Sequence, residues 1–214
     1  MVARVARPAG IGETCGVTVA GPRTPPLVLA SASPRRADLL RSAGIDFVAA
    51  PVDCDERWRP GEPPPTYAAR VARAKAELAL RAGAIVLAAD TTVWLSGQVE
   101  PLGKPADRAA ARAMLERLAG ARHCVTTAFA LADTRAPRTR WIERAVTTTV
   151  TMRPLSPAEI EAHLDFEDWR DKAGGYGIQS RAAGLVRAIE GSYTAVVGLP
   201  LAEVIEALGE LEFG

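Results

Sequence analysis

Short apolar runs separated by turn residues predict the strands of a β-sheet. Residues 84–89 form an uninterrupted apolar run that reaches Asp90, as expected for a central strand that stops there. Polar and apolar residues alternate over 141–152, which is typical of a half-exposed strand. Similar patterns predict strands at 27–31, 47–52, 124–131, 184–189 and 193–197, and a hairpin at 92–99 that turns at Ser96-Gly97-Gln98.

Capping residues and a helical period predict the helices. Ser33 with Pro34 is typical of a helix start, and Gly44 of its end. Residues 156–159, Ser-Pro-Ala-Glu, form a capping box that begins a helix ending near Leu164. Further helices are predicted from a Thr66 cap to Arg81, from an Asp107 cap to about Gly120, and from about Leu201 onward.

These elements predict one α/β domain. Strands and helices interleave, yet several strands follow each other directly, which favours a mixed β-sheet with flanking helices over a purely parallel one. The chain of 214 residues is long enough for one such domain, which we place at residues 27–214. Residues 1–26 carry arginines but no continuous apolar segment, so a disordered extension is expected rather than a secretory signal, with an organelle-import leader as the alternative.

Charge and cysteine content exclude several classes of function. A net charge of +1 lacks the basic excess of proteins that bind long nucleic acids, although a local cluster can still hold a small anion. No apolar run approaches the roughly 18 residues of a membrane span. Cys15, Cys54 and Cys124 are far apart and form no C-x-x-C pair. A disulfide framework or zinc site is therefore not expected, and a reducing, cytoplasmic compartment is.

Two segments are candidates for binding phosphate. Residues 31–36, Ser-Ala-Ser-Pro-Arg-Arg, combine a helix start, hydroxyls and two guanidinium groups, all of which suit a phosphate chain. A capped helix with two solvent-facing arginines would have the same sequence. Gly103-Lys104-Pro105 adds a cation, but its spacing from Gly97 and its proline differ from the G-x4-G-K-[ST] of a Walker A loop.

Carboxylates form the second group of candidates. Asp90 is predicted at the carboxyl end of a buried strand, where α/β sheets open their ligand crevice. There it can bind a divalent metal or activate water. The acidic residues Asp53, Asp55 and Glu56, with Lys75 further along, are compatible with a magnesium shell. For each carboxylate, a turn-forming or solvated role is the simpler alternative.

A glycine-rich segment, residues 172–179, is the last candidate. Its glycines permit close approach of the backbone, and Tyr176 and Gln179 could face a base. A plain surface loop is the competing interpretation. His123 and His163 have no serine or cysteine partner in a recognisable motif, so a hydrolase triad has little support.

Five segments, taken in order, resemble the Maf family of nucleotide pyrophosphatases from Leu27 to about Leu211. They are Leu-Ala-Ser-Ala-Ser-Pro-Arg-Arg (29–36), Ala-Asp-Thr (89–91), Leu-Gly-Lys-Pro (102–105), Asp-Lys-Ala-Gly-Gly-Tyr-Gly-Ile-Gln (171–179) and Gly-Ser-Tyr-Thr-Ala-Val-Val-Gly-Leu-Pro (191–200). The resemblance implies two lobes around a deep cleft and hydrolysis of a nucleoside triphosphate between its α and β phosphates. It also implies dependence on Mg²⁺ or Mn²⁺ and a homodimer.

The resemblance implies roles for single residues as well. Asp90 would be the general base or a metal-associated carboxylate, with Glu56 in the same metal and water shell. Base choice would be set by Arg35, Thr91 and Gln179. Phosphates would be held by Ser31, Arg35, Arg36, Lys75 and Lys104. The Tyr-Gly-Ile-Gln segment resembles the branch that prefers dTTP and UTP and clears surplus nucleotides.

Two alternatives remain at this point. One is the sister branch that acts on 7-methyl-GTP, and the other is a cell-division (septum) regulator that binds a protein partner without catalysis. The sequence has no exposed apolar helix or basic arm that favours the regulator. Pyrophosphate release from a nucleotide panel, with and without magnesium, separates these hypotheses.

Overall fold

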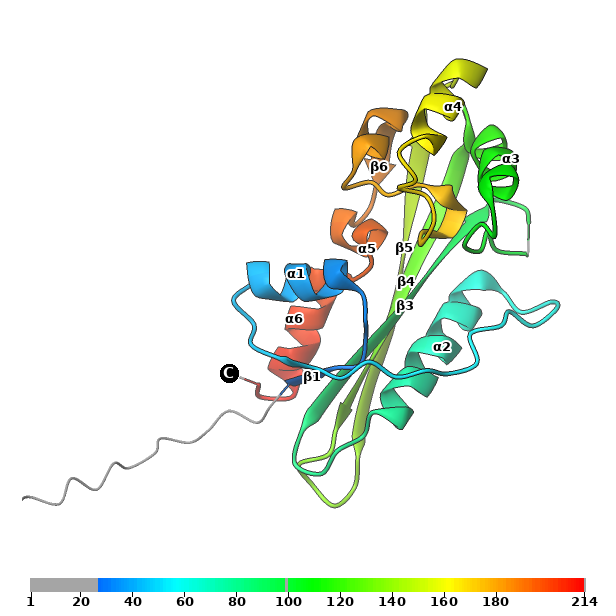
Figure 1. Cartoon of the computed structure of the whole chain (residues 1–214). Helices are drawn as coiled ribbons and strands as arrows, with labels where there is room; N and C mark the ends of the chain where they lie inside the picture. The colour runs from blue at the N-terminus through cyan, green and yellow to red at the C-terminus, as the bar shows by residue number, and fades with distance from the viewer. Residues whose placement is uncertain (1–26, 99, 214) are drawn as a thin grey trace, which may run out of the picture.

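The computed structural model describes residues 27–98 and 100–213. Within them a mixed sheet has the strand order β2-β1-β3-β4-β5-β6 (Figure 1). β1 pairs in parallel with β2 and β3, and the later strands pair antiparallel. The strands are β1 (Leu27–Leu29), β2 (Val48–Ala49), β3 (Ile85–Leu95), β4 (Arg122–Asp133), β5 (Arg140–Met152) and β6 (Val186–Glu190). The predicted fold class is confirmed, while the prediction for residues 1–26 lies outside the described residues.

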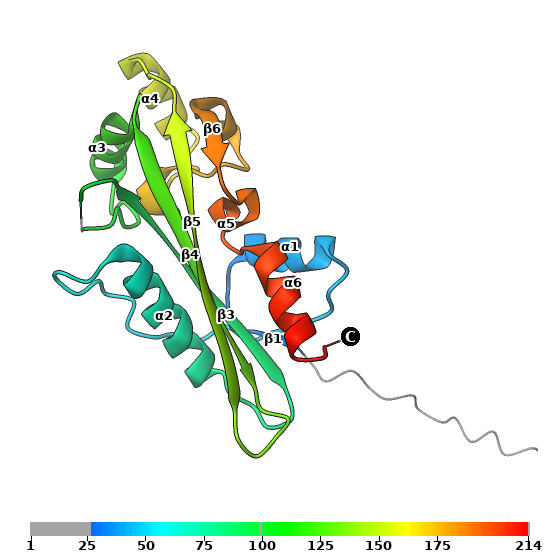
Figure 2. The same cartoon turned by 180° about the vertical axis from the view of Figure 1, so that it is seen from behind.

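Helices cover both faces of the sheet, as the two opposite views in Figures 1 and 2 show. α1 (Pro34–Ser42) and α6 (Leu201–Glu210) pack on one face, and α2 (Pro64–Leu78) packs on the other. α3 (Arg108–Leu118) and α4 (Pro157–Leu164) lie at the end of the long strands away from β1, and α5 (Tyr193–Val197) lies between them and α1, against β4 and β5. None of the helices in the described part of the chain is long and apolar enough to span a membrane.

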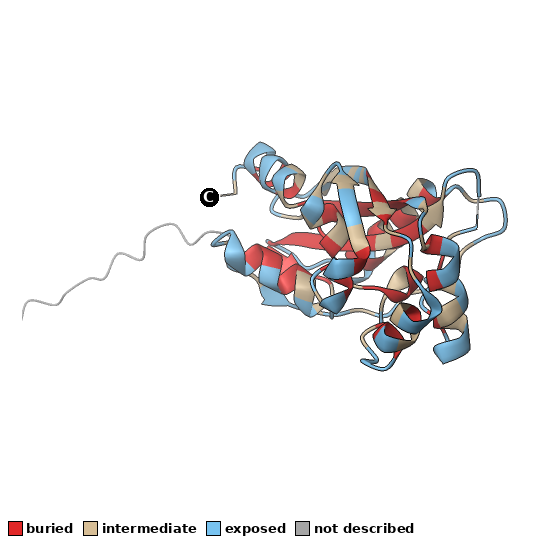
Figure 3. Ribbon diagram, turned by 90° about the horizontal axis from the view of Figure 1, so that it is seen from above, coloured by how far each residue is buried: buried red, intermediate tan, exposed pale blue. Residues whose placement is uncertain are grey.

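The alternation of side chains along β3 divides the core. Ile85 and Leu87 join the apolar cluster of α1 and α6, whereas Val86 and Ala88 join the cluster under α2. A separate buried cluster, which includes Leu115 of α3, fills the other end of the molecule. The central strands β1, β3 and β4 are mostly buried and the outer helix faces are exposed (Figure 3). The cluster of α1 and α6 is the core of one lobe, and the cluster that includes Leu115 is the core of the other.

The central strand is longer than predicted. β3 does not stop at Asp90 but continues to Leu95, because Asp90 pairs with Ala128 in the antiparallel ladder with β4. The predicted hairpin at 92–99 is reduced to a single bridge between Val93 and Leu102. Asp90 therefore lies within a strand and not in a loop.

Two helices also differ from the prediction. Residues 193–197 form α5 and not a strand, because the Ser192 hydroxyl accepts a hydrogen bond from Ala195 N and caps a helical turn. This local cap outweighs the β-propensity of the segment. α2 begins at Pro64, with Pro63 rather than Thr66 at the N-cap, and ends at Leu78.

The capping role predicted for Asp107 gives a test of local stability. Its side chain accepts a hydrogen bond of 2.7 Å from Ala110 N at the start of α3. Asp107→Ala removes this acceptor, so we expect the free energy of unfolding in denaturant to fall by about 1 kcal/mol. Ser33 precedes α1 but makes no side-chain capping bond. Ser33→Ala is therefore the matched control, and an equal loss in both variants would contradict the capping role.

Candidate active site

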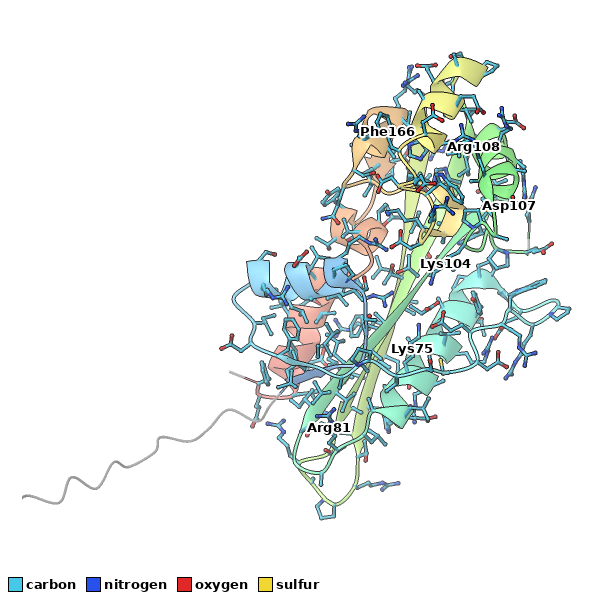
Figure 4. All side chains as sticks on the ribbon, viewed as in Figure 1. Lys75, Arg81, Lys104, Asp107, Arg108 and Phe166 are labelled. Atoms are coloured by element: carbon cyan, nitrogen blue, oxygen red, sulfur yellow. The ribbon has the colours of Figure 1, made fainter. Side chains whose placement is uncertain are left out.

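A cleft of about 940 Å³ opens beside the carboxyl end of β1 and the middle of β3. β1 ends at Leu29, opposite Leu87, whereas β3 continues past it. A space next to the end of a parallel strand is where α/β sheets bind ligands. All the site residues predicted from the sequence line this cleft, namely Ser31, Arg35, Arg36, Glu56, Lys75, Asp90, Thr91, Lys104 and Gln179. Lys75 and Lys104 are labelled in Figure 4.

Lys75 joins the two candidate carboxylates. α2 brings its Nζ atom to 2.8 Å from Asp90 Oδ1 and 2.7 Å from Glu56 Oε1. Lys75 and Asp90 are buried, whereas the Glu56 side chain is 47% exposed. The acidic run is split, because Asp53 also lines the cleft but Asp55 pairs with Arg57 on the surface. Glu56 is thus the member of the run that meets the buried pair.

Burial and charge move the pKa values of the two carboxylates in opposite directions. Burial raises the pKa of Asp90, and the opposing charges of Lys75 and Arg36 do not cancel this effect. Burial also acts to raise the pKa of Glu56, but the hydrogen bond and charge of Lys75 leave that pKa below its ordinary value. Paired carboxylates whose pKa values are separated in this way are typical of acid–base sites.

Arg36 is buried and held by three acceptors. Its Nε atom donates to Gly198 O at 2.8 Å, Nη1 to Ser31 Oγ at 3.0 Å and Nη2 to Thr91 Oγ1 at 3.3 Å. Burial lowers the pKa of Arg36, and the charge of Asp90 opposes this shift. A guanidinium group has five N–H donors, so these bonds leave donors for an anionic ligand.

Gly198 makes the anchoring of Arg36 geometrically feasible. It follows α5 with φ +131°, a conformation that residues with a Cβ rarely adopt. A Cβ atom at this position would lie 3.6 Å from Thr91 Oγ1 and 3.8 Å from Arg36 Nε. Glycine therefore allows the backbone to turn so that its carbonyl meets the arginine.

The glycine-rich segment is packed into the protein, which contradicts the surface-loop alternative. Gly174, Gly175 and Tyr176 are buried, and Tyr176 Oη lies 2.6 Å from Nε2 of the buried His123. Burial lowers the pKa of His123 to about 4, so this ring is neutral near pH 7. Gln179 is exposed and lines the cleft.

A charged chain links this segment to α1. Arg35 Nη1 lies 3.4 Å from Asp171 Oδ2, and Asp171 also accepts from Lys172 Nζ at 2.8 Å. A Cβ atom on Gly177 would approach Lys172 Cδ to 2.5 Å, so glycine leaves room for the lysine stem. All three charged residues line the cleft, so the chain of contacts joins α1 to the glycine-rich segment along the cleft wall.

The donor set is compatible with a divalent metal. Mg²⁺ is usually held by one or two carboxylates, with water and substrate phosphate completing its octahedral shell. Glu56 and Asp90 are joined by the Lys75 ammonium, and each uses only one carboxylate oxygen in that contact. Residues 27–98 and 100–213 contain no group of three or more His, Cys, Asp or Glu placed to hold a metal. These two carboxylates fit an ion that is shared with a phosphate ligand.

Two residues of the site were missed by sequence reasoning. Thr127 of β4 pairs with Thr91 across the ladder, and their hydroxyl oxygens are 2.9 Å apart. Gly198 anchors Arg36 through its carbonyl. The Gly-Leu-Pro that ends segment 191–200 was the available signal for Gly198, because glycine before proline marks a helix end. No local signal identifies Thr127, since strand register is a long-range property.

The mixed sheet and a cationic cleft around a buried carboxylate define an α/β protein whose site suits phosphate groups. The chain belongs to the Maf family, because the family model described as Maf-like protein matches residues 26–211. This confirms the resemblance in the five sequence segments.

Individual relatives cover nearly the same range. A dTTP/UTP pyrophosphatase from Hyphomonas neptunium is 50% identical over 88% of this chain and 98% of its own length. A second dTTP/UTP pyrophosphatase, from Syntrophus aciditrophicus, is 44% identical over 88% of this chain and 91% of its own length. A solved HAM1 protein from Coxiella burnetii covers 87% of this chain and 99% of its own, at 17% identity and a TM-score of 0.44, which is too low for a functional inference.

Proposed function

We propose that this protein hydrolyses nucleoside triphosphates to the monophosphate and pyrophosphate, with dTTP and UTP as preferred substrates. The observation that carries the proposal is the buried Asp90–Lys75 pair in a cleft that also holds Arg35, Arg36 and Lys104. A buried carboxylate can serve as base, and neighbouring cations can balance a triphosphate. The relatives named dTTP/UTP pyrophosphatase support the same substrates.

In this mechanism Asp90 prepares the attacking water. Lys75 donates to Oδ1 of Asp90 and orients the carboxylate, which leaves Oδ2 to accept the proton of a water molecule. The oxygen of this water attacks the α-phosphorus, the bond to the bridging oxygen breaks, and pyrophosphate leaves. When bound by Glu56 and Asp90, a divalent metal would neutralise charge on the phosphate oxygens.

The cations and the start of α1 hold the phosphates. Arg36 presents its remaining N–H donors from a fixed position, and Lys104 extends into the cleft from the loop before α3. Ser31 and the start of α1 line the same cleft, and helix starts favour anions. These groups contact phosphate only, so they act alike on every nucleotide.

Base choice is assigned to Gln179 as the main reader. Uracil and thymine present an N3–H donor beside the O4 acceptor, and a glutamine amide offers the complementary pair. Cytosine reverses both groups. Arg35 and Thr91 complete the set, with Arg35 held near the segment by Asp171.

The proposal extends to the cellular compartment and the oligomeric state. We place it in the cytoplasm, where nucleotide pools are used, as a homodimer of chains whose residues 27–214 form one catalytic domain. Light scattering of the purified protein measures the oligomeric state directly.

A nucleotide panel tests the proposed function. We expect pyrophosphate release from dTTP and UTP that requires Mg²⁺ or Mn²⁺, at least about tenfold higher kcat/KM than for CTP, and lower values for 7-methyl-GTP. Asp90→Asn is the control and should lose about 10²- to 10⁴-fold in rate while keeping its fold, because an amide cannot accept the proton. Near-full turnover by folded Asp90→Asn would remove Asp90 from the mechanism.

The raised pKa of Asp90 predicts the pH profile. The base must be ionised, so kcat/KM should fall as pH drops through a pKa that lies above the ordinary aspartate value. Because Lys75 lowers the pKa of Asp90, Lys75→Met should move this acidic limb to higher pH. Lys104→Met also removes a lysine from the cleft, but one that does not contact Asp90, and should leave the limb in place. If the acidic limb of the kcat/KM profile lies at the same pH in Lys75→Met and Lys104→Met, the role of Lys75 is contradicted.

Gln179 gives the test of base selection. Gln179→Ala removes both hydrogen-bonding groups, each worth roughly 1–3 kcal/mol when mismatched. We expect the preference for dTTP and UTP over CTP to fall about tenfold or more, with turnover still measurable. Arg36→Ala is the matched comparison and should lower kcat/KM by a similar factor for all bases. An unchanged ranking in Gln179→Ala would reject its assignment.

A further inference from the structure

A row of two hydroxyl groups runs along one face of the sheet from α5 to the cleft. Thr127 Oγ1 lies 2.7 Å from the carbonyl oxygen of Ala195, in the middle of α5, and 2.9 Å from Thr91 Oγ1. Thr91 Oγ1 in turn lies 3.3 Å from Arg36 Nη2. Thr127 is fully buried, and Thr91 is at the cleft surface. The row connects a side chain outside the cleft to a cation inside it.

Proton counting fixes the direction of every bond in this row. A carbonyl oxygen can only accept, and a threonine hydroxyl carries a single proton, so Thr127 must donate to Ala195 O. In its contact with Thr91, Thr127 is then the acceptor and Thr91 the donor. The only proton of Thr91 is therefore committed, and its oxygen presents lone pairs to Arg36.

We propose that Thr127 is a positioning residue of the active site, which takes the Thr91 proton and so makes Thr91 an acceptor that orients the Arg36 guanidinium. This inference rests on the proposed function and deepens it, because Arg36 is the phosphate-binding cation concerned. Gly198 O fixes Nε of the same guanidinium. Two carbonyls from one short segment, at Ala195 and Gly198, thereby set the plane in which Arg36 offers its free donors.

The neighbouring residue supplies a matched control. Thr126 is also fully buried on β4, and its hydroxyl bonds to Thr147 Oγ1 at 2.8 Å and to Trp94 Nε1 at 3.1 Å. It faces the opposite side of the sheet from Thr127 and does not line the cleft. Thr126→Val and Thr127→Val remove the same hydroxyl from the same strand, but only the second alters the row that ends at Arg36.

The experiment compares kcat and KM of the full chain for dTTP, UTP and CTP. We expect Thr127→Val to lower kcat about three- to tenfold by the same factor for each nucleotide, as for the loss of one hydrogen bond. Thr127→Ser keeps the hydroxyl and should stay within about twofold of the unmodified protein. Thr126→Val should retain kcat although it also loses a buried hydroxyl. Equal kcat in folded Thr127→Val and Thr126→Val would overturn the proposal.

A double-mutant cycle and a binding measurement complete the test. With Arg36→Ala already present, Thr127→Val should cause no further loss, and an additive loss would show that Thr127 does not act through Arg36. Thr127→Ala serves if the valine variant does not fold. Calorimetry with α,β-imido-dUTP, which is not hydrolysed between its α and β phosphates, compares the binding affinity of the Thr127→Val and Thr126→Val variants without turnover. An inactive unmodified protein would refute the proposed function, whereas an active protein whose Thr127→Val and Thr126→Val variants are equal in both kcat and binding would refute this inference alone.

Discussion

The buried ion pair between Lys75 and Asp90 constrains the rest of the structure. An aspartate inside a sheet needs a partner, and removing one member of a buried pair typically costs about 3–5 kcal/mol. Lys75 reaches Asp90 because α2 lies close to the sheet through its fully buried alanines Ala68, Ala72 and Ala76. Small side chains on this helix face therefore set the distance at which a lysine can neutralise the carboxylate.

Because β3 runs without interruption past the cleft, it presents a carboxylate on one face of the sheet and a hydroxyl on the other. Side chains of successive strand residues point to opposite faces, so Asp90 meets Lys75 from α2 whereas Thr91 meets Arg36 from α1. Had the strand ended at Asp90, neither direction would be fixed by the ladder. Pairing with β4 through Ala128 and Thr127 holds both residues in register.

Local signals predicted most of the elements but not the contacts that make the site. The capping bond of Asp107 and the box at 156–159 depend on residues three positions apart, and both were predicted correctly. The strand predicted at 193–197 was wrong because β-branched residues there are outweighed by the Ser192 cap and the Gly198 turn. Contacts such as that between Thr127 and Thr91 depend on strand register, which cannot be predicted from a short stretch of sequence. The candidate site itself came from the ordered segments and not from any single pattern.

The cations of the cleft differ in how firmly the protein holds them, and this difference matters for catalysis. Arg36 is buried and has three fixed acceptors, so its charge is in place before any ligand arrives. Lys104 is exposed, and Arg35 is partly exposed and shared with Asp171. Salt screens such solvent-facing charges more strongly than buried ones. The positions of Arg36 and Lys75 depend on packing rather than on solvent, so in the proposed mechanism theirs are the charges that ionic strength affects least.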